Sequence, residues 1–455
     1  MSNPVEIVGG GLAGSECAYQ LAERGVSVVL HEMRPEQRTP AHKTDHFAEL
    51  VCSNSFRSDD PFHAAGLLKR EMESFDSLVL ACARRAAVPA GGALAMDRDR
   101  FAADVSQHLE KHPKIEIRRQ EVESLPEGDA VIATGPLTSP AMAGALGSLL
   151  GDEYLYFYDA IAPIVDAESL DMGRLFWQSR YGKGDGDDYL NAALDRPQYE
   201  AFHQALVEAE VLPLHDFEKG LFFEGCLPIE ELARRGPDTL RYGCMKPVGL
   251  TPPDGSRPWA VLQLRRENLA KTHFNLVGFQ SRMKWPEQRR VFGLIPGLEN
   301  AEIVRFGQIH RNTFINAPTH LDPFYRLKAR PELRLAGQIT GVEGYLESAA
   351  TGLVIALYLH LERQGRTPTA LPATTALGAL ARHLTESNPK RFQPANINYG
   401  LFDELGRRVP KKQKRQVLAA RAHGALAAWA QVQGVPHRPI PTAPEVPQET
   451  ARVNS

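Results

Sequence analysis

The sequence predicts an α/β protein that opens with a β-α-β unit. Three observations predict this: an apolar run at residues 5–8, a glycine-rich turn directly after it, and a second apolar run at residues 26–30. Residues 15–24 carry apolar side chains at helical spacing, and Gly25 is a typical stop for that helix. A helix between two such strands predicts that they pair in parallel.

The remaining elements continue the α/β pattern along the chain, with a mixed block in the middle. They are a loop over residues 33–65, a helical stretch over 64–84, a buried strand at 130–135, a block of short strands and loops from about 160 to 325, a strand at 333–336, a long apolar helix over 347–362 and a largely helical segment over 373–432.

This order predicts one domain that is interrupted by another. Residues 1–155 form the first part of a nucleotide-binding domain, and residues 156–325 form a mixed α+β insertion domain that holds substrate. Residues 326–435 complete the first domain and add C-terminal helices. The proline-rich tail over 436–455 is expected to be disordered.

Composition excludes several classes of protein. The 455 residues are 43% hydrophobic and 24% charged, which excludes disordered, collagen-like and coiled-coil chains. A net charge of -3 excludes a wholly basic nucleic-acid coat, although a local basic patch remains allowed. No apolar run of about 18 residues and no export signal occur, so we expect a cytoplasmic protein without a membrane partner. The five cysteines form no C-x-x-C pair, so no metal is expected.

The glycine-rich turn predicts a dinucleotide site. Gly9, Gly11 and Gly14 stand in the order Gly-x-Gly-x-x-Gly between a strand and a helix, and Glu32 ends the next strand. The glycines allow a tight turn, a close approach to the pyrophosphate and close helix packing, while Glu32 can accept hydrogen bonds from ribose hydroxyls. The third glycine argues against an S-adenosylmethionine loop. The predicted cofactor-binding residues of this turn are Gly9, Gly10, Gly11, Leu12, Ala13 and Gly14.

Two later segments favour FAD over NAD as the bound cofactor. Gly135 closes a strand, as in FAD-binding Rossmann-like domains of the glutathione-reductase type. Gly337 and Gly341 precede a helix whose N-terminus can stabilise negative charge on a reduced flavin. No second Gly-x-Gly-x-x-Gly motif occurs, so NADH or NADPH must bind without a Rossmann domain of its own.

Two cysteines stand in loops and two in apolar helical stretches. Cys52 lies in a polar loop with Arg57 nearby, a setting that can lower the pKa of a thiol. Cys226 lies in a turn between glycine and Leu-Pro. Cys17 and Cys82 are expected to be buried and inert.

The chain resembles the folate- and FAD-dependent tRNA (uracil-5-)-methyltransferases of bacteria. The resemblance covers most of residues 1–365, and the segments around Cys52 and Cys226 are the most specific. The matching segments are residues 5–16, 49–57, 157–163, 223–229, 245–250, 306–316 and 335–345.

The resemblance implies an activity and a set of substrates. The family methylates C5 of uridine-54 in the T-loop of tRNA, with methylenetetrahydrofolate as the carbon donor, reduced FAD as the reductant and NAD(P)H as the source of electrons. It also implies that Cys52 and Cys226 are the catalytic pair. Thiolate addition to C6 of uracil makes C5 nucleophilic, which agrees with loop cysteines. Which cysteine attacks the ring and which assists stays open.

The candidate substrate contacts are aromatic and basic residues. A pterin stacks on flat partners, and His310, Arg311 and Tyr345 stand in matching segments as candidates for folate contact. Arg282 and Trp285 interleave basic and aromatic character, which suits RNA because an indole can stack on a base.

Two alternatives remain beside the methyltransferase. One is the related FAD-dependent protein family that modifies the wobble uridine of tRNA, whose members are usually longer and fit the Cys52 segment poorly. The other is a flavin- and RNA-binding protein without catalysis, against which the paired loop cysteines argue.

Overall fold

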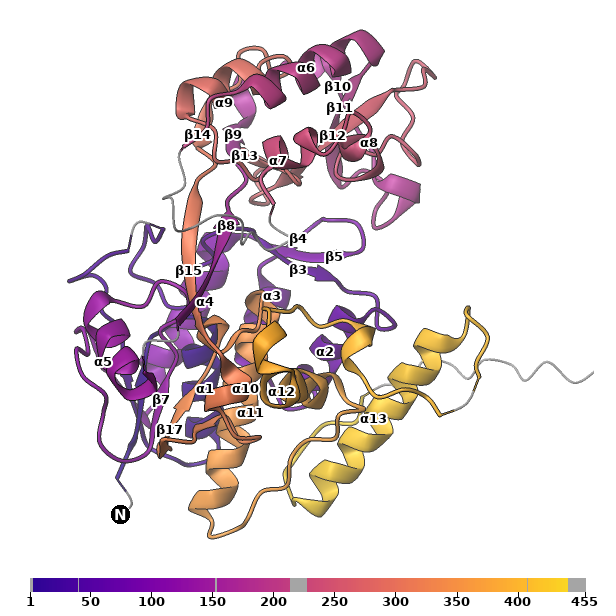
Figure 1. The fold of residues 1–455 in the computed structure, drawn as a ribbon. Helices are drawn as coiled ribbons and strands as arrows, with labels where there is room; N and C mark the ends of the chain where they lie inside the picture. The colour runs from indigo at the N-terminus through magenta and orange to yellow at the C-terminus, as the bar shows by residue number, and fades with distance from the viewer. Residues whose placement is uncertain (1–2, 40, 152–153, 213–226, 407, 441–455) are drawn as a thin grey trace, which may run out of the picture.

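The computed structural model describes residues 3–39, 41–151, 154–212, 227–406 and 408–440. Two sheets lie one above the other in Figure 1, and a two-stranded ribbon runs between them. The ribbon pairs β8 (Tyr154–Ala160) with β15 (Ile309–Ile315) in antiparallel register.

The first sheet carries the predicted β-α-β unit. Its strand order is β16-β17-β7-β1-β2-β6, and every pair except β16 with β17 is parallel. Buried valine, isoleucine and leucine side chains fill its central strands, as is typical of a parallel sheet covered on both faces. The strands are β1 (Val5–Val8), β2 (Val28–His31), β6 (Ile115–Arg118), β7 (Ala130–Ile132), β16 (Arg326–Leu327) and β17 (Arg330–Leu335).

Helices from both ends of the chain pack around this sheet. The α1 helix (Leu12–Glu23) lies against α11 (Tyr345–Arg363). Gly352 allows the close approach, because a Cβ there would lie 2.1 Å from the Ala13 carbonyl oxygen. The other helices of this part are α2 (Ala64–Glu73), α3 (Leu78–Arg85), α4 (Arg98–Lys111), α5 (Pro140–Leu150), α10 (Ala317–His320), α12 (Ala376–Glu386) and α13 (Lys414–Val432).

A small three-stranded sheet in the order β3-β5-β4 lies near the second sheet (Figure 1). Its strands are β3 (Ser55–Ser58), β4 (Ala87–Val88) and β5 (Ala93–Met96). The β3 strand directly follows the segment around Cys52, so this sheet anchors one end of that segment.

The second large sheet is antiparallel and has a hydrophobic core of its own. Its order is β10-β11-β12-β13-β9-β14. The strands are β9 (Ile164–Asp166), β10 (Leu175–Trp177), β11 (Tyr189–Leu194), β12 (Ala260–Arg266), β13 (His273–Leu276) and β14 (Ile303–Arg305). Its helices are α6 (Arg196–Glu208), α7 (Ile229–Arg234), α8 (Thr239–Tyr242) and α9 (Trp285–Phe292).

The structure confirms the predicted fold class and corrects several elements. The first helix begins at Leu12, three residues earlier than expected, because the glycine turn itself starts the helix. The single helix expected over 64–84 is two helices, since Ser77 caps a new one. The described residues between α12 and α13, 387–406 and 408–413, are mostly not helical.

The domain boundaries at 155 and 325 stay a prediction, as does the disordered tail, most of which lies outside the described residues. Within the described part of the chain, no helix is long and apolar enough to cross a membrane.

Candidate functional site

A deep hollow lies at the carboxyl ends of β1, β7 and β17, where a parallel sheet binds ligands. Its volume is about 150 Å³, and it opens to solvent. The predicted cofactor residues that line it are Gly9, Gly10, Gly11, Leu12, Ala13, Glu32, Gly135 and Gly337.

The glycines of the first turn have different roles, as the motif predicts. A Cβ on Gly11 would meet nothing within 4 Å, so this backbone faces open space that a pyrophosphate can fill. A Cβ on Gly14 would lie 1.9 Å from the Gly9 carbonyl oxygen, so Gly14 serves helix packing and not the lining. Gly341 does not line the hollow either, because it faces the ring of Phe392.

Glu32 is buried at the edge of the hollow and is held by a neighbour that sequence reasoning missed. Its carboxylate accepts hydrogen bonds from the Gly10 amide at 3.1 Å and from the Arg34 guanidinium at 2.9 Å. Burial by itself would raise the pKa of Glu32, but the hydrogen bonds and charge of Arg34 outweigh it and lower that pKa. Glu32 therefore stays ionised, as an acceptor for ribose hydroxyls should.

Residues 50–54, the Cys52 segment, border the same hollow. Val51 lines it, and so does Tyr345 at the start of α11. The Tyr345 hydroxyl accepts hydrogen bonds from the backbone amides of Cys52 at 2.5 Å and Ser53 at 3.1 Å. Tyr345 was expected to stack on a pterin; its observed contact is with the cysteine segment. Burial raises the pKa of Tyr345, so the phenol stays neutral at neutral pH.

Three arginines hold the same segment from outside the loop. Arg98, the first residue of α4, donates to the carbonyl oxygens of Leu50 at 2.7 Å and Cys52 at 3.3 Å. Arg305, at the end of β14, donates to the Val51 carbonyl oxygen.

Arg265 on β12 completes the set. It donates to the Ser53 hydroxyl at 2.9 Å and to the Asn54 side-chain oxygen at 2.7 Å. Two of the three arginines belong to the second sheet, so the Cys52 segment is built where the two parts of the protein meet.

A further ion pair joins the chain just after this segment to α11, whose first residue lines the hollow. Arg57, whose backbone φ is 62°, pairs with the fully buried Glu347 in the first turn of α11. Glu347 also accepts from the Ile397 amide at 2.8 Å. Arg57, the predicted basic neighbour of Cys52, therefore forms its ion pair with α11.

The other cysteines have different surroundings. Cys17 and Cys82 are buried, as expected, and burial raises the pKa of each thiol. Cys244 is half-buried, and burial raises its thiol pKa to about 11. Cys226 lies outside the described residues.

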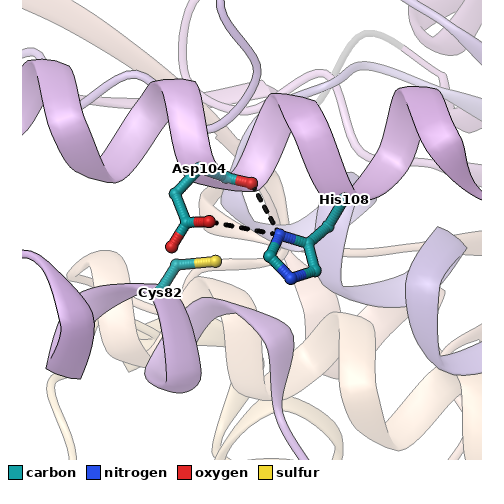
Figure 2. Close-up of side chains that lie close together, drawn as sticks. All are labelled: Cys82, Asp104 and His108. Atoms are coloured by element: carbon teal, nitrogen blue, oxygen red, sulfur yellow. Dashed lines mark hydrogen bonds and ion pairs between the residues drawn. The ribbon is translucent and has the colours of Figure 1, made fainter.

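Cys82 lies beside Asp104 and His108 of α4 in an arrangement that resembles a metal site (Figure 2). An arginine already serves this group: Arg85 donates to the Asp104 carboxylate at 2.7 Å and to the Cys82 sulfur at 3.2 Å. His108 in turn contacts Asp104 through its Nδ1. A metal ion would have to displace a guanidinium, so the geometry does not favour one here.

The remaining substrate candidates fall in three different situations. His310 and Arg311 lie in β15, where their backbone pairs with β8, and their side chains lie outside the description. Arg282 pairs with Glu231 and donates to the Leu212 carbonyl oxygen, and its contact with RNA stays a prediction.

Trp285 is half exposed, as a stacking residue should be. Its ring is stacked on Phe306 with 4.9 Å between centroids and 14° between planes. Phe306 directly follows Arg305 in the sequence and packs against the core of the second sheet.

The fold and the hollow together define an FAD-binding protein of the Rossmann-like class. The solved structure of Aquifex aeolicus GidA matches with a TM-score of 0.67 at 16% identity, covering 95% of this chain and 73% of that one. A family model described as "Glucose inhibited division protein A" matches residues 4–367.

Curated relatives are much closer in sequence. The "Methylenetetrahydrofolate--tRNA-(uracil-5-)-methyltransferase TrmFO" of Paramagnetospirillum magneticum is 55% identical over 94% of this chain and 99% of its own. The protein of the same name from Geobacter sulfurreducens is 56% identical over the same shares. The one from Listeria innocua is 52% identical over 95% of this chain and all of its own. The chain belongs to this family of folate-dependent tRNA methyltransferases.

Proposed function

We propose that this protein transfers the one-carbon unit of methylenetetrahydrofolate to C5 of uracil in tRNA, at uridine-54 of the T-loop. NAD(P)H is the source of electrons, and we place the activity in the cytoplasm, where tRNA is found. The observation that carries the proposal is the position of Cys52. Val51 of its segment lines the flavin hollow, and so does Tyr345, whose hydroxyl accepts a hydrogen bond from the Cys52 amide.

The hollow fits FAD on the geometry of its glycines and Glu32. The open space at Gly11 admits the pyrophosphate, and ionised Glu32 suits the ribose hydroxyls. When bound and reduced by NAD(P)H, the flavin would supply the two electrons that convert the transferred methylene to a methyl group. The residues of this chain bind the cofactor, hold the cysteine segment and move protons.

Methylation at C5 of uracil requires two protein groups that act on the pyrimidine ring. A thiolate adds to C6, which makes C5 nucleophilic toward the methylene carbon, and a base then takes the C5 proton before the thiolate leaves. We assign these two roles to Cys52 and Cys226, in an order that the experiments below decide. Tyr345 positions Cys52 by accepting hydrogen bonds from its backbone amide and that of Ser53.

We place RNA contact at the aromatic pair of Trp285 and Phe306. The Trp285 side chain is 50% exposed, with Phe306 stacked against it. Arg289, whose guanidinium lies 4.6 Å from the centre of the Phe306 ring, adds a positive charge. A base could stack on the open part of the indole. His310 and Arg311 remain our candidates for folate contact.

The decisive experiment supplies unmodified tRNA transcript, methylenetetrahydrofolate and NADPH or NADH to the purified flavoprotein. The proposal predicts 5-methyluridine at position 54, measured by nucleoside mass spectrometry, and no product on a transcript with cytidine at that position. Replacing the folate with S-adenosylmethionine should give no methylation. A product at the wobble uridine would favour the related wobble-modifying family instead, and methyl transfer from S-adenosylmethionine would overturn the proposal.

A further inference from the structure

The arginines around the Cys52 segment carry more positive charge than their neighbours neutralise. Arg98 pairs with Glu267 at 2.5 Å. Within the described residues, Arg265 and Arg305 form no ion pair with a carboxylate, and their hydrogen bonds go to neutral oxygens. Arg265 is 8% exposed, so its charge is held largely out of water. Arginine does not lose its proton in proteins, so the excess charge persists at any working pH.

Charged groups from several elements surround the segment that carries Cys52. The Cys52 thiol itself donates to the Ala160 carbonyl oxygen at the end of β8, at 4.0 Å from the sulfur. The charged and titratable groups around the segment are Arg98 of α4, Arg265 of β12 with Tyr189 of β11 beside it, Glu267 just after β12, Arg305 of β14, Tyr345 of α11, Arg57 of β3 with its partner Glu347, Glu49 with its partner Arg34, and His42 and Lys43 of the preceding loop.

The interaction between these groups and the cysteine is attractive when the thiol is ionised. Burial lowers the pKa of Arg305, Arg98 lowers it further, and negative charge on Cys52 or Glu267 opposes both. Burial likewise lowers the pKa of Arg265, again opposed by negative charge on its neighbours, Cys52 among them. The same Coulomb attraction must favour the thiolate over the thiol, because the interaction is shared by both partners.

We propose that Arg265 and Arg305, which reach the cysteine segment from the second sheet, are positioning residues that hold Cys52 as a thiolate. The thiol proton is released to solvent, so no redox partner is needed. A thiolate at this position can add to C6 of the pyrimidine or accept the C5 proton, so the inference serves either role of Cys52. Its relevance to methylation rests on the proposed function, but ionisation itself can be measured without tRNA.

Two substitutions at Arg305 separate charge from hydrogen bonding. Arg305→Gln keeps an N–H donor for the Val51 carbonyl oxygen and removes the charge. Arg305→Lys keeps the charge with a different donor geometry. Arg196→Gln on α6, an exposed arginine paired with Glu200, is the matched control for losing an arginine from the second part of the protein.

The experiment measures the alkylation rate of Cys52 in the FAD-loaded full chain from pH 5 to 10, with iodoacetamide and peptide mass spectrometry. An opposite charge at close range usually lowers a pKa by about 1–3 units. We therefore expect the midpoint of the pH profile to rise by about one unit or more in Arg305→Gln, and to stay near wild type in Arg305→Lys and Arg196→Gln.

An unchanged midpoint in Arg305→Gln would overturn the inference, and so would an equal shift in Arg305→Lys, which would point to loop geometry alone. If Arg305→Gln fails to retain FAD, wild type is compared with Arg305→Lys and Arg265→Lys instead. Because both variants keep the charge, the midpoint of their alkylation profiles must stay near that of wild type, and a raised midpoint in both would overturn the inference. A low midpoint in a protein that does not methylate tRNA would leave this inference standing and refute the proposed function.

Discussion

The Tyr345 hydroxyl is the contact whose removal tests the site most cleanly. Tyr345→Phe keeps the ring that lines the flavin hollow and removes only the acceptor for two backbone amides. A buried donor left without a partner costs about 1–3 kcal/mol. Cys52 is only half-buried, so water can replace part of the loss. We expect the pair of lost hydrogen bonds to destabilise the segment by about 1–3 kcal/mol in total.

This loss should appear in the reaction rate more than in cofactor binding. If the loosened segment must be reordered in the transition state, a cost of about 1.4–2.7 kcal/mol slows methylation by about 10–100-fold. The assay is the initial rate of 5-methyluridine formation on tRNA transcript, with FAD content measured after denaturation. FAD content should stay near that of wild type.

The matched control is Tyr399→Phe. The Tyr399 hydroxyl donates to the Phe62 carbonyl oxygen at 2.9 Å, so this variant also loses one tyrosine hydroxyl. It should lose some stability and keep its rate. Wild-type methylation by Tyr345→Phe would refute the view that this hydroxyl positions the cysteine segment, and equal rate losses in both variants would assign the effect to general destabilisation.

Three further predictions address the cofactor turn, a buried carboxyl and the RNA contact. Gly11→Ala should leave the melting temperature of the FAD-free protein unchanged and weaken FAD binding in titrations, whereas Gly14→Ala should destabilise both forms, because only its Cβ meets the backbone, at 1.9 Å from Gly9 oxygen. Burial raises the pKa of Glu71 to about 8, although the amides of Ala376 and Leu377 oppose the shift, so the folded state holds a proton that the unfolded state loses above about pH 4.5. Stability should therefore fall as pH rises from about 5 to 8, and urea denaturation of Glu71→Gln should lack that part of the slope; an identical slope in both proteins would contradict the assignment. Trp285→Ala should weaken tRNA binding by about tenfold, from a stacking contribution of about 1–3 kcal/mol, while Tyr242→Ala, at an 82% exposed tyrosine on α8, should bind normally in filter-binding assays; equal affinities would remove Trp285 from the RNA contact.

The cofactor turn could be predicted because all its determinants are local. Gly9, Gly11 and Gly14 lie within six residues, and their spacing reflects the backbone geometry that a dinucleotide needs. Gly341, predicted with them, lies outside the lining of the hollow, and its left-handed backbone lies against the ring of Phe392, so its cofactor contact stays a prediction.

The surroundings of Cys52 could not be predicted in the same way. Arg98, Arg265 and Arg305 stand in ordinary charged contexts and meet only when the two sheets pack together. Tyr345 was singled out for its segment, but its hydroxyl bonds to an amide 293 residues earlier, a pairing that no local pattern specifies. The pairing of Arg282 with Glu231 likewise joins residues 51 positions apart, so the sequence around Arg282 did not indicate it.

We infer that cysteine chemistry at the edge of the flavin hollow acts on uracil in tRNA. The most direct measurement uses a T-arm RNA with 5-fluorouridine at the target position, because fluorine blocks loss of the C5 substituent after thiolate addition. We predict a covalent protein–RNA adduct with the wild type, detected by denaturing gel and peptide mass spectrometry. The adduct should disappear in only one of Cys52→Ala and Cys226→Ala, while both variants lose methylation and retain FAD. An adduct that persists in both variants, or wild-type methylation rates in either, would contradict the account.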